Sequence, residues 1–425
     1  KVASSLKNNF LPPEKNPTDS TRAWLSYLTG LNYYWSNEQM IDFELAIRYF
    51  ERAIQIDPQF SLAYAKLSSA HCIIYHYHYD RSENRLLQAR RYLSRANEVD
   101  PENPDVLLAE GIYSYVTNDY ESALEKYNAA EKMTSGNSEL YLMIGSLYRR
   151  KGHLEKTIEY YSKSYEIDPQ NRTIALELGE TYLMLRKYDE SEKYFDIYTS
   201  LGGNYDNRYV SKFHLYLMSG KGMDKSRQVL MEARALSGKI ADMQLTDNQI
   251  RIELLDRKYE DALTVLDSEE TDTLDNQFHY KFRSLYCGEI YWLQNSMEWA
   301  NRYFDSARIH LESKIDDSPQ DHRYHSALGI AYAGLGRKEE AIESGLTAIR
   351  LMPPEKDYYK AIFRLEDMAR IYTMVGEYQR ALDQLDQLLS MPSLMSVQLL
   401  RKDPIWEPLR ELPDFQNLME NHRDN

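Results

Sequence analysis

Three segments of 34 residues follow one another without a gap: PDVLLAEGIYSYVTNDYESALEKYNAAEKMTSGN (104–137), SELYLMIGSLYRRKGHLEKTIEYYSKSYEIDPQN (138–171) and RTIALELGETYLMLRKYDESEKYFDIYTSLGGNY (172–205). Gly111, Gly145 and Gly179 occupy the same place in the three segments. An aromatic or hydroxyl residue follows each glycine three positions later. Self-similarity at a fixed period of this length indicates a repeat architecture, in which stacked units share a continuous core.

Two rows of small residues extend this pattern along the chain. Gly111 is followed twelve residues later by Ala123, which is followed seven residues later by Ala130, with the bulky Tyr127 between the alanines. Apolar residues fall at helical spacing around these positions. We therefore expect two helices in each unit, because a small residue on the first helix lets the second approach closely while a bulky residue fills the remaining space. Proline then ends the second helix.

The pattern resembles the tetratricopeptide repeat (TPR) over nearly the whole chain. The resemblance implies an all-α fold, a right-handed superhelical solenoid of about nine or ten helix-turn-helix units over residues 21–393. Residues 1–20 are expected to be a lead-in that ends a preceding segment, and residues 394–425 a C-terminal helical cap. Unit seven, at about 243–275, fits the pattern least. A single array is the first expectation, and a bend or break within 202–275 is the alternative.

Composition argues against several classes of function. The net charge of −15 and the isoelectric point of about 5.3 disfavour nucleic acid as a ligand, because binding to its backbone requires clustered Lys and Arg. No apolar run reaches the ~18 residues of a membrane span. The only cysteines, Cys72 and Cys287, lie far apart, which excludes a disulfide framework. We find no phosphate loop and no set of nucleophile, base and orienting residue, so we predict neither enzymatic activity nor a cofactor.

One histidine-rich segment raises the question of a metal site. The stretch HCIIYHYHYD, residues 71–80, contains Cys72 and His76 four positions apart, together with His71, His78 and Asp80. Such spacing would place two ligands on one helix face. The favoured interpretation is a buried cysteine beside exposed histidines, because no second Cys/His group completes a four-ligand site. His322 and His325 receive the same interpretation, so no metal ligand is predicted.

Protein binding is the more plausible activity. In this repeat class the concave face is built mostly from the first helix of each pair, and an apolar stripe with a few charges there suits a peptide or an amphipathic helix. Packing against the adjacent repeat is the alternative role for these side chains. A polar clamp for chaperone C-termini is not expected, because leucines occupy its first positions in units three to five. The groove prediction comprises Leu108, Ile112, Tyr115, Leu142, Ser146, Arg149, Leu176, Glu180 and Leu183.

The two ends of the chain narrow the resemblance. The start, KVASSLKNNFLPPEKNPTDSTRAWLSYLTGLNYYW (1–35), and the near-terminal KDPIWEPLRELPDFQNLM (402–419) resemble the C-terminal repeat region of large bacterial signalling proteins. In those proteins a TolB-like segment and a winged-helix, kinase or cyclase module lie upstream. The resemblance implies a non-enzymatic interaction module that binds a protein partner or its own upstream domain, on the cytoplasmic or periplasmic side, with the cytoplasm favoured. The alternative is a ligand- or metal-sensing domain, which would use residues 71–80 or the seam near unit seven.

The C-terminal segment is expected to close the array. A solenoid leaves an apolar face exposed at its last unit, and terminal units must cover that face. Asp403 and Pro404 form a helix-start signal, and Pro413 with Asp414 predicts a second short helix. Trp406, Leu409, Phe415, Leu418 and Met419 are then the lid over the last unit.

Overall fold

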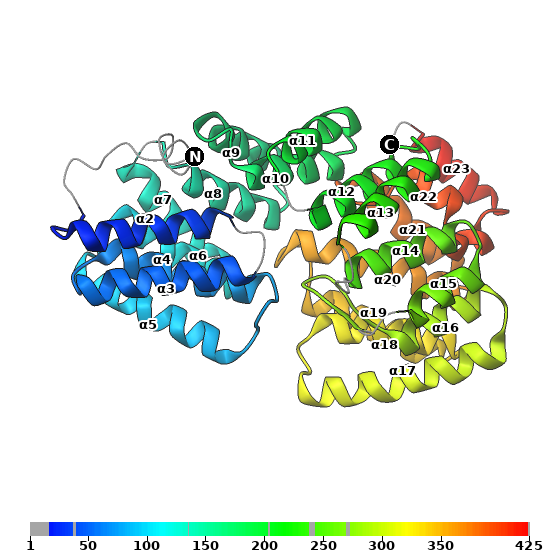
Figure 1. The fold of residues 1–425 in the computed structure, drawn as a ribbon. Helices are drawn as coiled ribbons and strands as arrows, with labels where there is room; N and C mark the ends of the chain where they lie inside the picture. Colours follow the sequence, from blue (N-terminus) through cyan, green and yellow to red (C-terminus); the bar gives the residue numbers. More distant parts are fainter. Residues whose placement is uncertain are drawn as a thin grey trace. The chain divides into compact units, whose positions relative to one another are not determined.

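The computed structural model describes residues 17–36, 40–134, 136–202, 205–237, 243–268 and 273–423. Consecutive antiparallel helix pairs make up almost all of it (Figure 1). The predicted all-α stack of helix pairs is therefore confirmed. The expected lead-in at 1–20 falls, for residues 1–16, outside the described residues. No described helix is long and apolar enough to cross a membrane.

The chain divides into two compact units, which are described separately below. Unit 1 comprises residues 1–149, 153–178 and 201–203, and unit 2 comprises residues 150–152, 179–200 and 204–425. The helices of unit 1 are α2 (Thr21–Ser36), α3 (Met40–Ile56), α4 (Ser61–His76), α5 (Glu83–Val99), α6 (Pro104–Val116), α7 (Tyr120–Met133), most of α8 (Ser138–Arg150), α9 (Leu154–Ile167) and the first half of α10 (Arg172–Met184).

An aromatic ring packs directly on the repeat glycine in both units. A Cβ atom added at Gly145 would lie 2.5 Å from a ring carbon of Tyr161, and one added at Gly111 would lie 2.3 Å from Tyr127. The same arrangement recurs at Gly30 with Phe50, Gly179 with Phe195, and Gly288 with Phe304. The period read from the sequence thus reflects a contact that admits no side chain on the first helix.

Replacing Gly145 with alanine should lower the free energy of unfolding by about 1–3 kcal/mol, because the added methyl group overpacks the contact with Tyr161. Chemical denaturation measures the change. The control is Glu166→Ala on the exposed face of α9, which should change stability by less than about 0.5 kcal/mol. Equal stabilities for both variants would contradict the close-approach interpretation.

Unit 2 contains the remaining helices and one short hairpin. Its elements are α11 (Tyr188–Ser200), α12 (Tyr205–Met218), α13 (Met223–Ser237), α14 (Met243–Leu255), α15 (Tyr259–Asp267), β1 (Thr273–Asp275), β2 (Tyr280–Phe282), α16 (Arg283–Leu293), α17 (Met297–Asp317), α18 (His322–Gly334), α19 (Lys338–Leu351), α20 (Tyr358–Met374), α21 (Tyr378–Ser390), α22 (Val397–Lys402), the 3-10 helix η1 (Pro404–Leu409) and α23 (Pro413–Asn421). The strands pair antiparallel, with Leu274 opposite Lys281. The sequence showed no strand pattern strong enough to predict this hairpin.

The end of unit 2 returns to its beginning. The amide of Ser393 donates to the carbonyl of Met184, at 3.0 Å. The guanidinium of Arg186 donates to the carbonyls of Leu388, Met391 and Met395 at 2.9–3.2 Å. Helix α22 contacts α12, which agrees with the position of the C-terminal helices beside α12 and α13 in Figure 1. The repeats of unit 2 therefore close on themselves.

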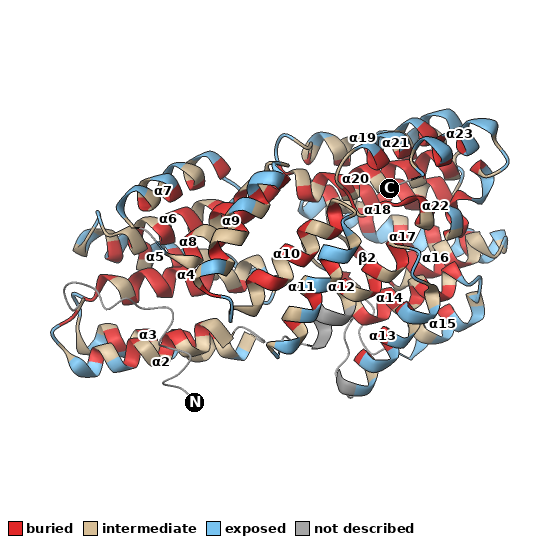
Figure 2. Ribbon diagram, turned by 90° about the horizontal axis from the view of Figure 1, so that it is seen from above, coloured by how far each residue is buried: buried red, intermediate tan, exposed pale blue. Residues whose placement is uncertain are grey.

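The C-terminal segment fills the end of the stack. Asp403 caps η1 by accepting a hydrogen bond from the amide of Ile405, at 3.1 Å. Helix η1 contacts α20, and α23 contacts α21. All five predicted lid residues, Trp406, Leu409, Phe415, Leu418 and Met419, are buried. In Figure 2, buried residues in red and exposed residues in pale blue both occur along α23. The segment thus covers the last repeat and also closes unit 2.

Candidate functional site: a cavity inside unit 2

A cavity with a volume of about 270 Å³ lies within unit 2. Five first helices of helix pairs line it, namely α10, α12, α14 and α16 from four consecutive pairs, and α20 from the pair after α18 and α19. Hairpin residues between 276 and 281, Leu394 and two cap residues, Asp403 and Ile405, complete the lining. We call this feature the central cavity. It is the concave face of unit 2, which the hairpin and the cap narrow into a pocket.

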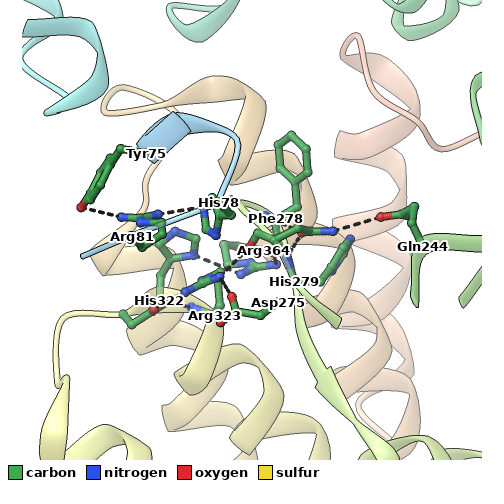
Figure 3. A network of polar contacts seen from close by, with 12 residues as sticks. Tyr75, His78, Arg81, Gln244, Asp275, Phe278, His279, His322, Arg323 and Arg364 are labelled. Carbon is green, nitrogen blue, oxygen red and sulfur yellow. Dashed lines mark hydrogen bonds and ion pairs between the residues drawn. The ribbon is translucent and has the colours of Figure 1, made fainter. Parts of the chain in front are cut away.

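Arginines from two helices hold the hairpin tip in place (Figure 3). Arg364 donates to the carbonyl of Phe278 at 2.6 Å, and Arg323 pairs with Asp275 at 2.5 Å. Within the tip, the side chain of Asn276 accepts from the amides of Phe278 and His279, both at 2.9 Å. The tip is therefore a fixed part of the cavity wall.

Most charges on the cavity wall have partners within the protein. Asp247 accepts a hydrogen bond from the hydroxyl of Tyr286 at 2.7 Å and lies 3.8 Å from the ammonium of Lys281. Arg370 pairs with Asp403 at 3.2 Å and with Glu366 at 3.4 Å. On the same helix, Asp367 accepts from Ser326 and pairs with Arg364.

Two charged side chains on the wall lack such partners. No hydrogen bond or ion pair joins the guanidinium of Arg251 to any described residue, and its Nε atom is buried. Glu289, on the neighbouring α16, likewise has no hydrogen bond or ion pair within the described part of the chain. Burial raises the pKa of the Glu289 carboxyl above its ordinary value. Both side chains are half-buried and line the cavity, so both are available to the polar groups of a ligand there.

Buried histidines in unit 2 are held in the neutral form. Burial, together with the positive charge of Arg364, lowers the pKa of His322 to about 2, and the Arg364 guanidinium donates to its Nδ1 atom at 3.0 Å. Burial likewise lowers the pKa of His214 to about 3 and the pKa of His279 well below its ordinary value. Arg251 contributes to both of these depressions by its positive charge.

Acid should destabilise unit 2 through His322. The unfolded chain binds a proton below the ordinary pKa of 6.5 while the folded chain does not, so stability is lost as the pH falls below 6.5. For one histidine the loss between pH 7.5 and pH 5 is about 2 kcal/mol. Denaturation of the unaltered chain and of His322→Gln at both pH values measures it. The variant should lose about 2 kcal/mol less over this interval, and equal losses would contradict the assignment.

Most of the predicted groove residues are packed inside the protein. Leu108, Ile112 and Tyr115 belong to a core cluster of unit 1. Leu142, Ser146 and Arg149, also in unit 1, are buried, and Arg149 pairs with Glu177 at 2.5 Å. Leu176 is half-buried. This burial favours packing against the adjacent repeat as the role of these side chains in the third and fourth repeats. Glu180 and Leu183, by contrast, line the central cavity of unit 2.

The histidine-rich segment does not assemble a metal site. Cys72 is buried in the core of unit 1, and His71 packs against Tyr92. His78 contacts Arg81 at 2.7 Å, and Arg81 donates to Tyr75 (Figure 3). Asp80 pairs with Arg85 at 2.7 Å. Among the described residues, no group of three or more His, Cys, Asp and Glu lies close enough together to hold a metal ion.

The sequence did not predict the parts of the site that depart from the repeat pattern. Helix α14 belongs to the seventh repeat, which fits the pattern least, yet it supplies Asp247, Ile250, Arg251 and Leu254 to the cavity. The hairpin tip follows from an insertion that the repeat pattern cannot predict. A local signal was present, because Asp275-Asn276 is a turn-forming pair next to the short alternation Tyr280-Lys281-Phe282.

Comparison with family models identifies the repeats. One model described as a tetratricopeptide repeat matches residues 36–60 and 138–171, and a second with the same description matches 78–138 and 298–355. The chain contains tetratricopeptide repeats. TPR folds are in general non-catalytic scaffolds that bind protein partners.

Similar proteins share the repeat but differ in length. A TPR repeat-containing protein of Methanocaldococcus jannaschii is 27% identical over 49% of this chain and 40% of its own length. Superkiller protein 3 of Schizosaccharomyces pombe is 23% identical over 76% of this chain and 23% of its own length. This chain therefore spans less than half the length of either relative.

Solved structures with related folds are more distant. Human IFIT1 is 14% identical, with a TM-score of 0.46, over 83% of this chain and 75% of its own. The type IV pilus biogenesis factor PilW is 15% identical, with a TM-score of 0.40, over 54% of this chain and 98% of its own.

Proposed function

We propose that this TPR chain is a non-enzymatic interaction module that receives a short polypeptide segment in the central cavity of unit 2. The segment belongs to a partner protein or to another domain of the same polypeptide. The observation that carries the proposal is that five first helices, which build the concave face of a TPR array, converge on one cavity with two unpaired charges. Charged groups in such a cavity fix the orientation of a ligand.

The size of the cavity limits the segment. An α-helix with its side chains is about 10–12 Å across, so two turns of a helix do not fit in a cavity of about 270 Å³. A few residues in an extended conformation or at a chain end do fit. Of the two predicted ligands, a peptide or an amphipathic helix, we therefore propose the peptide, inserted as a short tail.

The setting that we propose is a bacterial regulator. The resemblance of the two chain ends to the repeat region of multidomain signalling proteins supports it. In that setting, ligand binding in unit 2 would report to an output module elsewhere in the polypeptide.

A small-molecule sensor is the second candidate function. The same cavity favours it, because its volume lies just below the range of about 300–1,000 Å³ that is typical of sites for drug-sized ligands. In this case the regulatory signal would be a metabolite in place of a protein tail.

Panning a random peptide library, displayed both with free C-termini and within flanking sequence, tests the first candidate. Met374 lines the cavity and is half-buried, so Met374→Trp should fill part of the space and weaken the selected peptides at least about tenfold. The matched control is Met297→Trp on the exposed start of α17, which should bind as the unaltered chain does. Peptides that bind Met374→Trp normally would contradict the cavity as the site. If no peptide is selected whose binding depends on the cavity, the peptide-binding function is contradicted and the small-molecule sensor is the function that is kept.

A further inference from the structure

We infer that the ligand of the central cavity carries both a carboxylate and a protonated amine, close enough together to fit the cavity. Free amino acids and very short peptides have this chemistry, and so does a C-terminal lysine residue of a protein. The inference rests on the proposed function only in that it places the ligand in the central cavity.

The carboxylate of the ligand is inferred from Arg251. Its guanidinium faces the cavity without a hydrogen bond or ion pair to any described residue, and its Nε atom is buried. The other two wall cations are already engaged, Lys281 with Asp247 and Arg370 with Asp403 and Glu366. A planar guanidinium binds a carboxylate through two parallel hydrogen bonds. Arg251 is therefore the wall cation that no described residue already engages.

The surroundings of Arg251 can add neutral donors to this subsite. His214 and His279 both line the cavity, and burial together with the charge of Arg251 keeps both imidazoles uncharged. A neutral imidazole still offers one N–H group. An anionic group at Arg251 can thus be held without a second cation competing for it.

The amine of the ligand is inferred from Glu289 and from the excess of carboxyl groups over cations on the cavity wall. The lining contains six carboxyl groups, Glu180, Asp247, Glu289, Glu366, Asp367 and Asp403, against the three cations Arg251, Lys281 and Arg370. Glu289 is the member of this set on α16, and it has no hydrogen bond or ion pair among the described residues. An ammonium group placed there would partner the half-buried carboxyl group of Glu289 and offset part of the negative charge.

Aromatic side chains on the same wall suit this ligand. Tyr286 and Trp292 lie on α16 with Glu289, and Tyr359 and Phe363 lie on α20. Aromatic faces attract an ammonium group and also pack against the apolar part of a ligand. A ligand with one carboxylate, one amine and a small apolar body matches the lining and the volume of about 270 Å³.

Thermal-shift and calorimetric titrations of the full chain test this inference, with each of the twenty free L-amino acids as a separate probe. At least one should bind, and its amide and its N-acetyl derivative should each bind at least about tenfold more weakly. Acetylated tetrapeptides ending in lysine form a second arm, in which the lysine side chain supplies the amine. Binding in this arm alone identifies a protein C-terminus as the source, and binding of free amino acids alone identifies a small metabolite.

Two variants assign the contacts. Arg251→Met should abolish the difference between the acid and its amide, and Glu289→Gln should abolish the difference between the amine and its N-acetyl form. Arg302→Met and Glu298→Gln, on the exposed face of α17, are matched controls that should preserve both differences. Circular dichroism checks that each variant is folded.

Three outcomes would overturn the inference. These are no binding in either arm, equal binding of the blocked and unblocked compounds, and retention of both differences in Arg251→Met and Glu289→Gln. If Met374→Trp blocks the selected peptides while Arg251→Met and Glu289→Gln bind them normally, the proposed function stands and this inference fails. Peptides or amino acids that bind Met374→Trp normally would instead contradict the proposed function.

Discussion

Replacing Trp406 with alanine should lower the free energy of unfolding by about 3–5 kcal/mol. Trp406 is 1% exposed and is the largest fully buried side chain among the described residues. It lies in η1, which contacts α20, and the guanidinium of Arg370 is 5.9 Å from its ring centroid. Its removal would leave a cavity where the C-terminal segment covers the last repeat, and would weaken the closure of unit 2.

Chemical denaturation followed by far-UV circular dichroism measures this loss. Trp299→Ala is the matched control, because Trp299 is 46% exposed on α17. The control should lose less than about 1 kcal/mol. If the two variants lose the same stability, the C-terminal segment does not act as the cap.

Replacing Asp357 with alanine should have an effect of similar size, about 3–5 kcal/mol. Asp357 is 1% exposed and pairs with Arg150 at 3.4 Å and with Lys360 at 3.2 Å. Its carboxylate also caps α20 by accepting from the amide of Lys360, at 3.0 Å. Arg150 is 2% exposed, so loss of Asp357 leaves a buried cation with fewer acceptors and a helix without its N-cap.

Asp357→Asn separates the two contributions. The amide oxygen can still cap α20, whereas the negative charge opposite Arg150 is lost. We expect the free energy of unfolding of Asp357→Asn to lie between those of the unaltered chain and Asp357→Ala, measured by the same denaturation experiment. A loss for Asp357→Ala below about 1 kcal/mol would mean that the buried pair contributes little net stability.

The repeat core could be predicted because, at each repeated position, a single neighbouring side chain determines which residue fits. Gly145 and Gly179 must be small because Tyr161 and Phe195 occupy the space beside them. That requirement recurs with the period and is visible in the sequence. The C-terminal cap was predictable for a similar reason, since Asp403 and Pro404 form a helix start next to the apolar Trp406.

The central cavity could not be predicted because it depends on contacts between distant segments. The tip of the hairpin is fixed by Arg323 and Arg364, which lie more than 40 residues further along the chain. The hydrogen bond from Ser393 to Met184 likewise corresponds to no periodic pattern in the sequence. The resemblance to the repeat class assigned the first helices to the concave side. Helical spacing could not distinguish a packed position such as Ile112 from a cavity position such as Arg251.

The central claim, that ligand is bound in the cavity of unit 2, is tested most directly by hydrogen–deuterium exchange. The chain is compared with and without the tightest peptide or amino acid from the binding screens. We predict that protection rises in α14, in the hairpin at 273–282 and in α16, which together carry Arg251, His279 and Glu289. Protection confined to α6 and α8 of unit 1, where Leu108 and Leu142 lie, would contradict the claim.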